Sequence, residues 1–231
     1  YKCDEKVDIY DATPNIPDGC DYVNIKYTNF VTEAGAESFA SKYFLNEITA
    51  YDFGTYYLDA LEYIYGTDVI SKWFFDDDLY FTKMLYDEFN DSDKVLKILD
   101  ALDDTTSLDA TYKDVGYLMD VLIEIYQNNK KGDYLSDKEF TYLLRPMLNY
   151  VNVSKSKYYD EFKSLINLDY GVINDLKEQV DYEEFNQYLV PIIIDDKMYL
   201  SWSVWNISDS KSGIIWILYN FKKDEIKDYK V

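Results

Sequence analysis

Three consecutive aspartates, Asp76, Asp77 and Asp78, are the residues whose type and spacing most directly suggest chemistry in this chain. They stand between aromatic residues in the stretch WFFDDDLYF, and together with backbone carbonyls their carboxylates could bind calcium. Adjacent side chains on a helix, however, point about 100° apart, so the three could not hold one ion without further ligands. The same residues suit a helix start, where an Asp N-cap and nearby acids are favoured by the helix dipole. We therefore predict a helix start here rather than a metal site, and no cofactor.

Hydrolysis of a glycan by two carboxylates is the enzymatic reaction that the composition leaves open. Such acids need only lie about 5–10 Å apart in space, and with 44 Asp and Glu residues their pairing cannot be found from the sequence. The chain has no histidine, which removes Ser-His-Asp and Cys-His catalysis and most zinc and iron sites. Arg145 is the only arginine, so the chain is poorly equipped for phosphoryl transfer. These features favour a non-enzymatic protein, with a carboxylate-pair glycan hydrolase as the alternative.

Aromatic residues near the C-terminus are the candidates for binding a partner. Tyr199, Trp202 and Trp205 fall in the stretch MYLSWSVWN, whose β-branched and aromatic residues predict a strand. Because side chains alternate along a strand, Trp202 and Trp205 are expected on opposite faces of the sheet. One face has to pack on the helices, and the other could present aromatic anchors to a protein partner. The alternative is that both faces are covered and the tryptophans belong to the core.

The two cysteines, Cys3 and Cys20, bear on the compartment. The turn-rich segment between them favours a disulfide, which would close a loop worth about 3 kcal/mol in the chain-entropy model. The alternative is two unrelated thiols. The chain begins at Tyr1, as a processed protein would. We therefore predict an extracytoplasmic or secreted protein.

The elements that position these residues follow from hydrophobic periodicity. The pattern is helical over most of the chain between residues 32 and 189 and becomes strand-like after residue 190. The expected helices cover residues 32–47, 49–65, 68–75, 77–90, 92–102, 111–128, 136–144, 155–168 and 173–189. The expected strands cover residues 191–194, 198–207 and 214–221, with a further strand at 21–30.

The predicted fold class is α+β, predominantly α-helical with a C-terminal antiparallel β-meander that an N-terminal strand could join. We expect one globular domain over residues 1–231. Its predicted parts are a turn-rich arm with the disulfide (1–20), a mainly helical region (32–189), the meander (190–221) and an exposed charged tail (222–231).

Several residues are expected to fix the ends of helices. Ser92 is a predicted N-cap, and Ser136 with Glu139 has the spacing of a capping box. Gly66 can end a helix in the left-handed conformation. Pro146 should kink or shorten the helix that contains it.

The net charge of −21 and the pI of about 4.2 limit the partners. Such a surface repels phosphate backbones and anionic lipids, so neither direct nucleic-acid binding nor membrane insertion is expected. A protein partner, plausibly a basic one, fits the charge. The leading prediction is therefore a non-enzymatic, extracytoplasmic acidic protein-binding module, such as an inhibitor, an immunity protein or a secreted effector. A cytosolic acidic mimic of nucleic acid is a further alternative, and the oligomeric state does not follow from the sequence.

Overall fold

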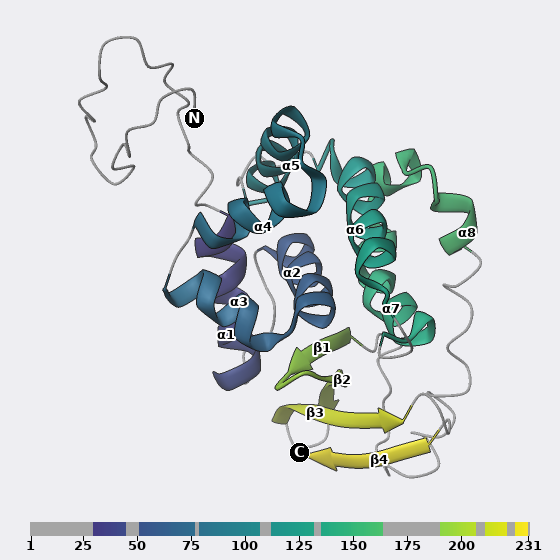
Figure 1. Ribbon diagram of the computed structural model, residues 1–231. Helices are drawn as coiled ribbons and strands as arrows, with labels where there is room; N and C mark the ends of the chain where they lie inside the picture. The colour runs from purple at the N-terminus through teal and green to yellow at the C-terminus, as the bar shows by residue number, and fades with distance from the viewer. Residues whose placement is uncertain are drawn as a thin grey trace.

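The computed structural model describes residues 30–44, 51–76, 79–106, 112–131, 135–163, 190–206, 211–220 and 225–230. Helices make up the larger part, and an antiparallel sheet lies against one side of them (Figure 1). The helices are a π-helical turn (Phe30–Ala34), α1 (Gly35–Phe44), α2 (Asp52–Tyr65), α3 (Thr67–Phe75), α4 (Leu79–Phe89), α5 (Ser92–Asp104), α6 (Val115–Asn129), α7 (Asp137–Leu144), two 3-10 helices (Arg145–Asn149 and Val151–Lys155) and α8 (Tyr159–Lys163). The strands are β1 (Val190–Ile194), β2 (Lys197–Asn206), β3 (Lys211–Asn220) and β4 (Glu225–Lys230). The predicted α+β fold class, mainly helical with a C-terminal antiparallel meander, is confirmed.

Helix α2 lies at the centre of the helical part and contacts α1, α3, α6, α7 and β1. The apolar face that the sequence predicts for it is buried throughout: Phe53, Tyr57, Leu61 and Ile64. The helix is also buried on its other faces, so that the charged residues Asp59 and Glu62 lie inside the protein. A helix surrounded in this way has to find partners for its polar side chains within the core.

The sheet is a meander in the order β1-β2-β3-β4, with every neighbouring pair antiparallel. Asp195 and Asp196 form the two-residue turn between β1 and β2, and both have positive φ, +49° and +58°. Positive φ at both central residues is typical of the type I′ turn, whose twist matches that of the strands it joins. Ile193, Met198 and Leu200 belong to the same buried cluster as the helical core, which fixes the sheet against the helices.

The charged C-terminal segment is not a free end over residues 225–230, where the sequence led us to expect no strand. These residues form β4 and pair with β3, with Tyr229 opposite Ile217 and Glu225 opposite Asn220. The register shifts between Leu218 and Tyr219. Charged side chains are common on a strand at the edge of a sheet because they discourage pairing with other chains. Their polarity therefore did not exclude a strand.

The expected N-terminal strand falls mostly on residues 21–29, which lie outside the described residues. At Phe30 the prediction is wrong, because this residue begins the π-helical turn before α1. Its ring is buried and lies 6.0 Å from the ring of Trp73, and its N–H donates to Asp103 Oδ1 at 3.0 Å. The expected helix at 173–189 also lies outside the described residues.

Most of the predicted helix ends are confirmed, with one displaced by a residue. The N-cap of α5 is Asp91 and not Ser92: its Oδ1 accepts the N–H groups of residues 93 and 94. Gly66 ends α2 as predicted, and its N–H donates to the Glu62 carbonyl, but with φ +97° and ψ 153° it is not the left-handed cap that was expected. Helix α7 ends at Leu144, and Pro146 stands in the 3-10 helix that follows.

The capping box at the start of α7 contains a tyrosine from another helix. Ser136 Oγ accepts the N–H of Glu139, as predicted. The reciprocal bond is not direct: the Ser136 N–H donates to the Tyr63 hydroxyl at 2.8 Å, and this hydroxyl donates to Glu139 Oε2 at 2.9 Å. Tyr63 thus joins α2 to α7 while it completes the cap.

Candidate functional site

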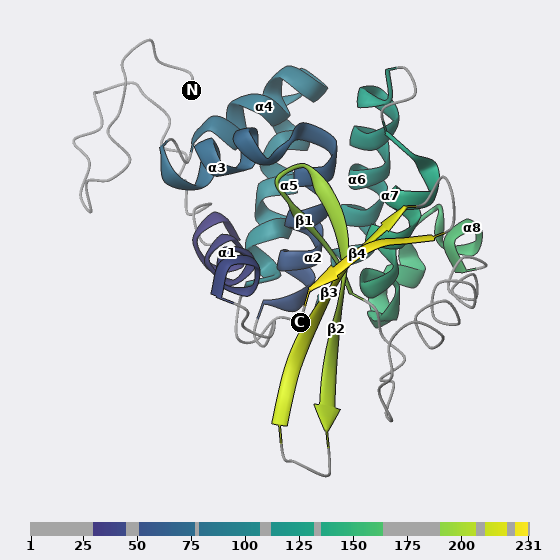
Figure 2. The same cartoon turned by 90° about the horizontal axis from the view of Figure 1, so that it is seen from below.

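The three residues predicted to bind a partner lie on β2, the second strand of the sheet. Tyr199 is half-buried and pairs with Ile192 on β1 and Leu218 on β3. For Trp202 and Trp205 the structure describes the backbone alone, which pairs with residues 215 and 212 of β3. Alternation along this continuous strand places the two positions on opposite faces of the sheet. Seen from below, the β2–β3 hairpin extends beyond the helices (Figure 2), and partner binding by these three residues stays a prediction.

The aspartate run does not begin a helix at its first residue. Asp76 follows the last turn of α3, where its N–H donates to the Lys72 carbonyl at 2.9 Å, and α4 starts at Leu79. Asp77 and Asp78 lie outside the described residues, as do Cys3 and Cys20. Within the described part of the chain, no three Asp, Glu, His or Cys side chains are grouped so that they could hold a metal ion.

The feature that the sequence did not single out is a group of four aromatic side chains on α1 and α3, two of them exposed and two half-buried. We call it the aromatic patch: Phe39, Tyr43, Phe74 and Phe75. Phe75 is 68% exposed and Tyr43 is 52% exposed. The ring centroid of Phe39 lies 5.8 Å from that of Tyr43, 4.9 Å from that of Phe74 and 5.0 Å from that of Phe75. The four rings therefore form one continuous surface.

Local sequence explains how the aromatic patch forms. Phe39 and Tyr43 are four residues apart on α1, so they occupy the same helix face. Phe74 and Phe75 are the last two residues of α3, and their rings meet at 89° with centroids 4.8 Å apart. Gly35 leaves room for the Phe74 ring, since a Cβ at that position would lie 2.4 Å from Phe74 Cδ2. The two helices can thus approach closely and bring their aromatic residues together.

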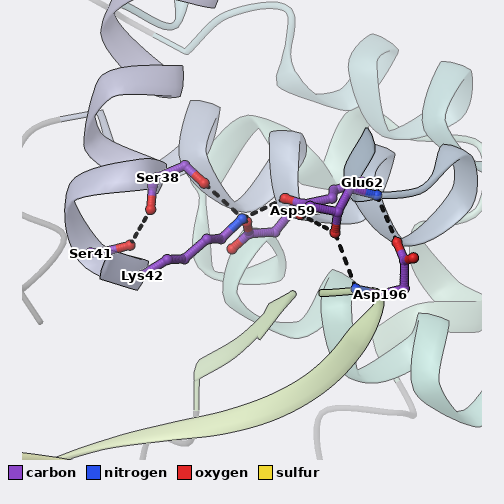
Figure 3. Close-up of polar contacts among 7 residues, drawn as sticks. Ser38, Ser41, Lys42, Asp59, Glu62 and Asp196 are labelled. Atoms are coloured by element: carbon purple, nitrogen blue, oxygen red, sulfur yellow. Dashed lines mark hydrogen bonds and ion pairs between the residues drawn. The ribbon is translucent and has the colours of Figure 1, made fainter. Parts of the chain in front are cut away.

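A buried ion cluster lies next to the aromatic patch on α1. We call Lys42, Asp59 and Glu62 the ion cluster; the three residues are 7%, 1% and 4% exposed. Lys42 extends from α1 towards α2, where its Nζ lies 2.6 Å from Asp59 Oδ1 and 2.5 Å from Glu62 Oε2 (Figure 3). Ser38 Oγ donates to Asp59 Oδ1 at 3.2 Å. One cation and two anions are therefore enclosed with several of their hydrogen bonds made.

Hydrogen bonds connect the ion cluster to the sheet. The Thr67 hydroxyl donates to Glu62 Oε1 at 2.7 Å. The Thr67 N–H donates to Asp196 Oδ1 at 2.7 Å, and the Asp196 N–H donates back to Thr67 Oγ1 at 3.1 Å. Asp196 belongs to the β1–β2 turn, so its carboxylate lies at the N-terminus of α3 (Figure 3). This is a favourable place for negative charge because of the helix dipole.

The electrostatics of the ion cluster follow from its burial. Burial raises the pKa of Asp59 to about 6, although Lys42 opposes the shift. Burial lowers the pKa of Lys42, but Asp59 and Glu62 outweigh it and hold this pKa above its ordinary value. Enclosed charges of this kind are stable only when paired and hydrogen-bonded. Because the three groups are almost fully buried, they are placed to join helices and not to meet a substrate.

Two of the described carboxylates have a raised pKa, and neither supports the hydrolase alternative. Asp59 is one, and it is enclosed. Asp103 is another: burial raises its pKa to about 6, and its Oδ1 accepts the Phe30 N–H. A carboxylate bonded to the backbone in this way stabilises the turn before α1. A carboxylate-pair hydrolase therefore remains a prediction that these two residues do not favour.

Comparison with protein-family models, with curated proteins and with solved structures found no match. No helix in the described part of the chain is both long enough and apolar enough to span a bilayer. The pair Phe74–Phe75 at a helix end, and the i, i+4 spacing of Phe39 and Tyr43, were the sequence features from which the aromatic patch could have been found.

Proposed function

We propose that the protein is a non-enzymatic binding module that engages a basic protein partner through the aromatic patch. The observation that carries the proposal is the exposure of Phe75 and Tyr43 beside the rings of Phe39 and Phe74. Large aromatic side chains usually lie inside, and contiguous exposed ones are typical of interaction sites. Aromatic anchors also dominate the energetics of many interfaces.

The charge around the aromatic patch supports a basic partner. The exposed Asp76 directly follows Phe75 in the sequence. At Tyr43, burial and then the charges of Asp195 and Glu62 raise the pKa of the phenol, so negative potential reaches this end of the patch as well. With a net charge of −21, the whole chain would attract a cationic surface from a distance. The fitting partner is a segment with apolar side chains flanked by lysine or arginine, such as an amphipathic basic helix.

We expect the negative charge of the chain and the aromatic patch to contribute to binding in different ways. Long-range charge attraction would speed association and make it depend on salt, whereas the aromatic anchors would set the lifetime of the complex. An extracytoplasmic site of action is part of the proposal, and it depends on a disulfide between Cys3 and Cys20. Alkylation of both thiols without prior reduction, detected by intact mass, would remove that part.

A direct test uses a synthetic helical peptide of lysine and leucine with one apolar face. The peptide is titrated into the ¹⁵N-labelled protein, and amide chemical shifts are followed at low and high salt. We expect saturable shifts concentrated on α1 and α3, with an affinity that falls at least tenfold between 50 mM and 500 mM salt. A peptide with glutamate in place of lysine is the control and should not bind. Absence of binding, or shifts confined to other elements, contradicts the proposal.

A further inference from the structure

A second group of aromatic side chains surrounds Asp52, the first residue of α2. The hydroxyls of Tyr112 and Tyr150 both hydrogen-bond to the Asp52 carboxylate. Their ring centroids are 5.1 Å apart with the planes at 59°. The ring of Phe53 lies 5.1 Å from Tyr150 and 6.2 Å from Tyr112. We call these four residues and Tyr56 the tyrosine cluster.

The tyrosine cluster is buried at Phe53 and partly exposed to solvent at its other residues. Phe53 is fully buried, whereas Asp52, Tyr56, Tyr112 and Tyr150 are half-buried and keep part of their surface in solvent. Asp52 Oδ1 also accepts the Phe53 N–H at 2.9 Å, which fixes the orientation of the carboxylate. Part of the surface of the three tyrosines and of the oriented carboxylate is therefore in contact with solvent.

Negative potential is concentrated at the tyrosine cluster. Burial, and then the charges of Asp52, Asp59 and Glu37, raises the pKa of Tyr56 to about 12. Burial, and then Asp52 and Glu37, raises the pKa of Tyr112 as well. Among the described residues, the charged groups that chiefly shift the pKa of Tyr56, Tyr112 and Tyr150 are carboxylates and neighbouring tyrosines. The tyrosines thus stay neutral at physiological pH, with intact π faces in an anionic setting.

The backbone of Tyr112 shows that the cluster is held in a fixed arrangement. Its φ is +47°, in the left-handed region that favours glycine. A bulky residue keeps this conformation only where its surroundings hold it there. The bond to Asp52 and the ring contacts with Phe53 and Tyr150 provide such surroundings. The phenol is therefore positioned before any ligand arrives.

We propose that the tyrosine cluster binds an alkylammonium group, such as a lysine side chain, with the cation over the rings of Tyr112 and Tyr150 and beside Asp52. A cation is attracted to the face of an aromatic ring, and a carboxylate adds a counter-ion. A metal ion would need several oxygen ligands, and no group of three metal-ligating side chains occurs among the described residues. The inference goes beyond the proposed function, because it requires neither the aromatic patch nor a protein partner.

The probe for this site is Nα-acetyl-lysine-N′-methylamide, titrated into the ¹⁵N-labelled full chain. We expect saturable shifts at the amides of residues 52–56, 112 and 150 with a dissociation constant in the millimolar range. The Nε-acetylated probe keeps the backbone and the four-carbon side-chain stem but lacks the charge, and it should bind at least tenfold more weakly. Asp52→Asn and Tyr150→Leu should each weaken binding of the charged probe at least fivefold.

Two further variants complete the test, one as a control and one as a substitute. Tyr159→Leu removes a half-buried tyrosine on α8 whose ring already has the Lys163 ammonium 5.9 Å from its centroid. It should leave the affinity within twofold. Tyr112→Phe retains the ring and is the substitute if Tyr150→Leu does not fold; it should weaken binding two- to fivefold. Equal affinity for the charged and acetylated probes, or binding of methyl-β-glucoside in place of the charged probe, overturns the inference.

Discussion

Lys42 and Tyr43 are neighbours on α1, yet the lysine is 7% exposed and the tyrosine is 52% exposed. Charged side chains usually lie at the surface of a protein and large aromatic ones inside. The ion cluster and the aromatic patch show the reverse, with buried charge in the first and exposed rings in the second. In the ion cluster, charge lies inside, where Lys42 is paired with Asp59 and Glu62. In the aromatic patch, rings lie outside, where they contact one another and solvent. One helix supplies residues to both.

The difference between the two regions shows what each contributes. The ion cluster joins α1 to α2, and through Thr67 and Asp196 it also joins the helices to the sheet. Its removal should therefore change stability. The aromatic patch leaves apolar area in water, which folding alone does not require, and its removal should change binding with little effect on stability. Variants in each region can separate these two roles.

The largest effect is expected from Lys42→Met. This change leaves Asp59 and Glu62 buried without their cation, so the free energy of unfolding should fall by about 3–5 kcal/mol. Urea unfolding measures the change. Lys113→Met is the control, because Lys113 pairs with Asp104 at the surface and its removal should change stability far less. Equal stability of Lys42→Met and wild type would show that the ion cluster does not hold the helices together.

A smaller, pH-dependent effect is expected from Asp59. Its pKa is about 6 in the folded protein and about 3.9 in an unfolded chain. Because the folded state binds this proton more tightly, ionised Asp59 lowers stability at pH 7, and the penalty decreases progressively as the pH falls from about 6 to about 4. Relative to Asp59→Asn, the wild type should gain roughly 1 kcal/mol between pH 7 and pH 5. Urea unfolding of both proteins at the two pH values checks this; a constant or opposite difference contradicts it.

The smallest effect on stability is expected at the turn between β1 and β2. Asp196→Asn removes the negative charge at the N-terminus of α3 and should cost about 0.5 kcal/mol. Asp195→Asn is a matched control, because both residues have positive φ and only Asp196 accepts the Thr67 N–H. Asparagine tolerates positive φ as well as aspartate does. Equal losses for both variants would mean that the turn, and not the charge at the N-terminus of α3, determines the change.

The sequence predicted the elements better than it predicted their environment. Helical periodicity located α2, α5 and α6, and local cap chemistry located Ser136, because these features depend on neighbouring residues only. The ion cluster could not be predicted, since Lys42, Asp59 and Glu62 look like exposed residues until α1 and α2 pack together. The sequence also could not show β4, whose polar residues pair with β3 only in the folded chain.

In the candidate site, too, the sequence shows which residues are aromatic, but tertiary packing determines which of them are exposed. The adjacent aromatic residues Phe74 and Phe75 would ordinarily be assigned to the core. In the fold Phe75 is exposed, whereas Phe74 is half-buried and its ring fits against α1 only because Gly35 has no side chain. At Tyr112, the positive φ depends on contacts with residues far away in the sequence. Such features follow from tertiary packing, which hydrophobic periodicity does not encode.

The most direct test of the account compares Phe75→Ser with Val151→Ser in binding to the lysine–leucine peptide. Val151 is 87% exposed and lies in a 3-10 helix outside the aromatic patch. Both variants should keep the free energy of unfolding within about 0.5 kcal/mol of the wild type. We predict that Phe75→Ser weakens peptide binding at least tenfold and that Val151→Ser changes it less than twofold. Equal affinities for the two variants would contradict the claim that the aromatic patch is the binding surface.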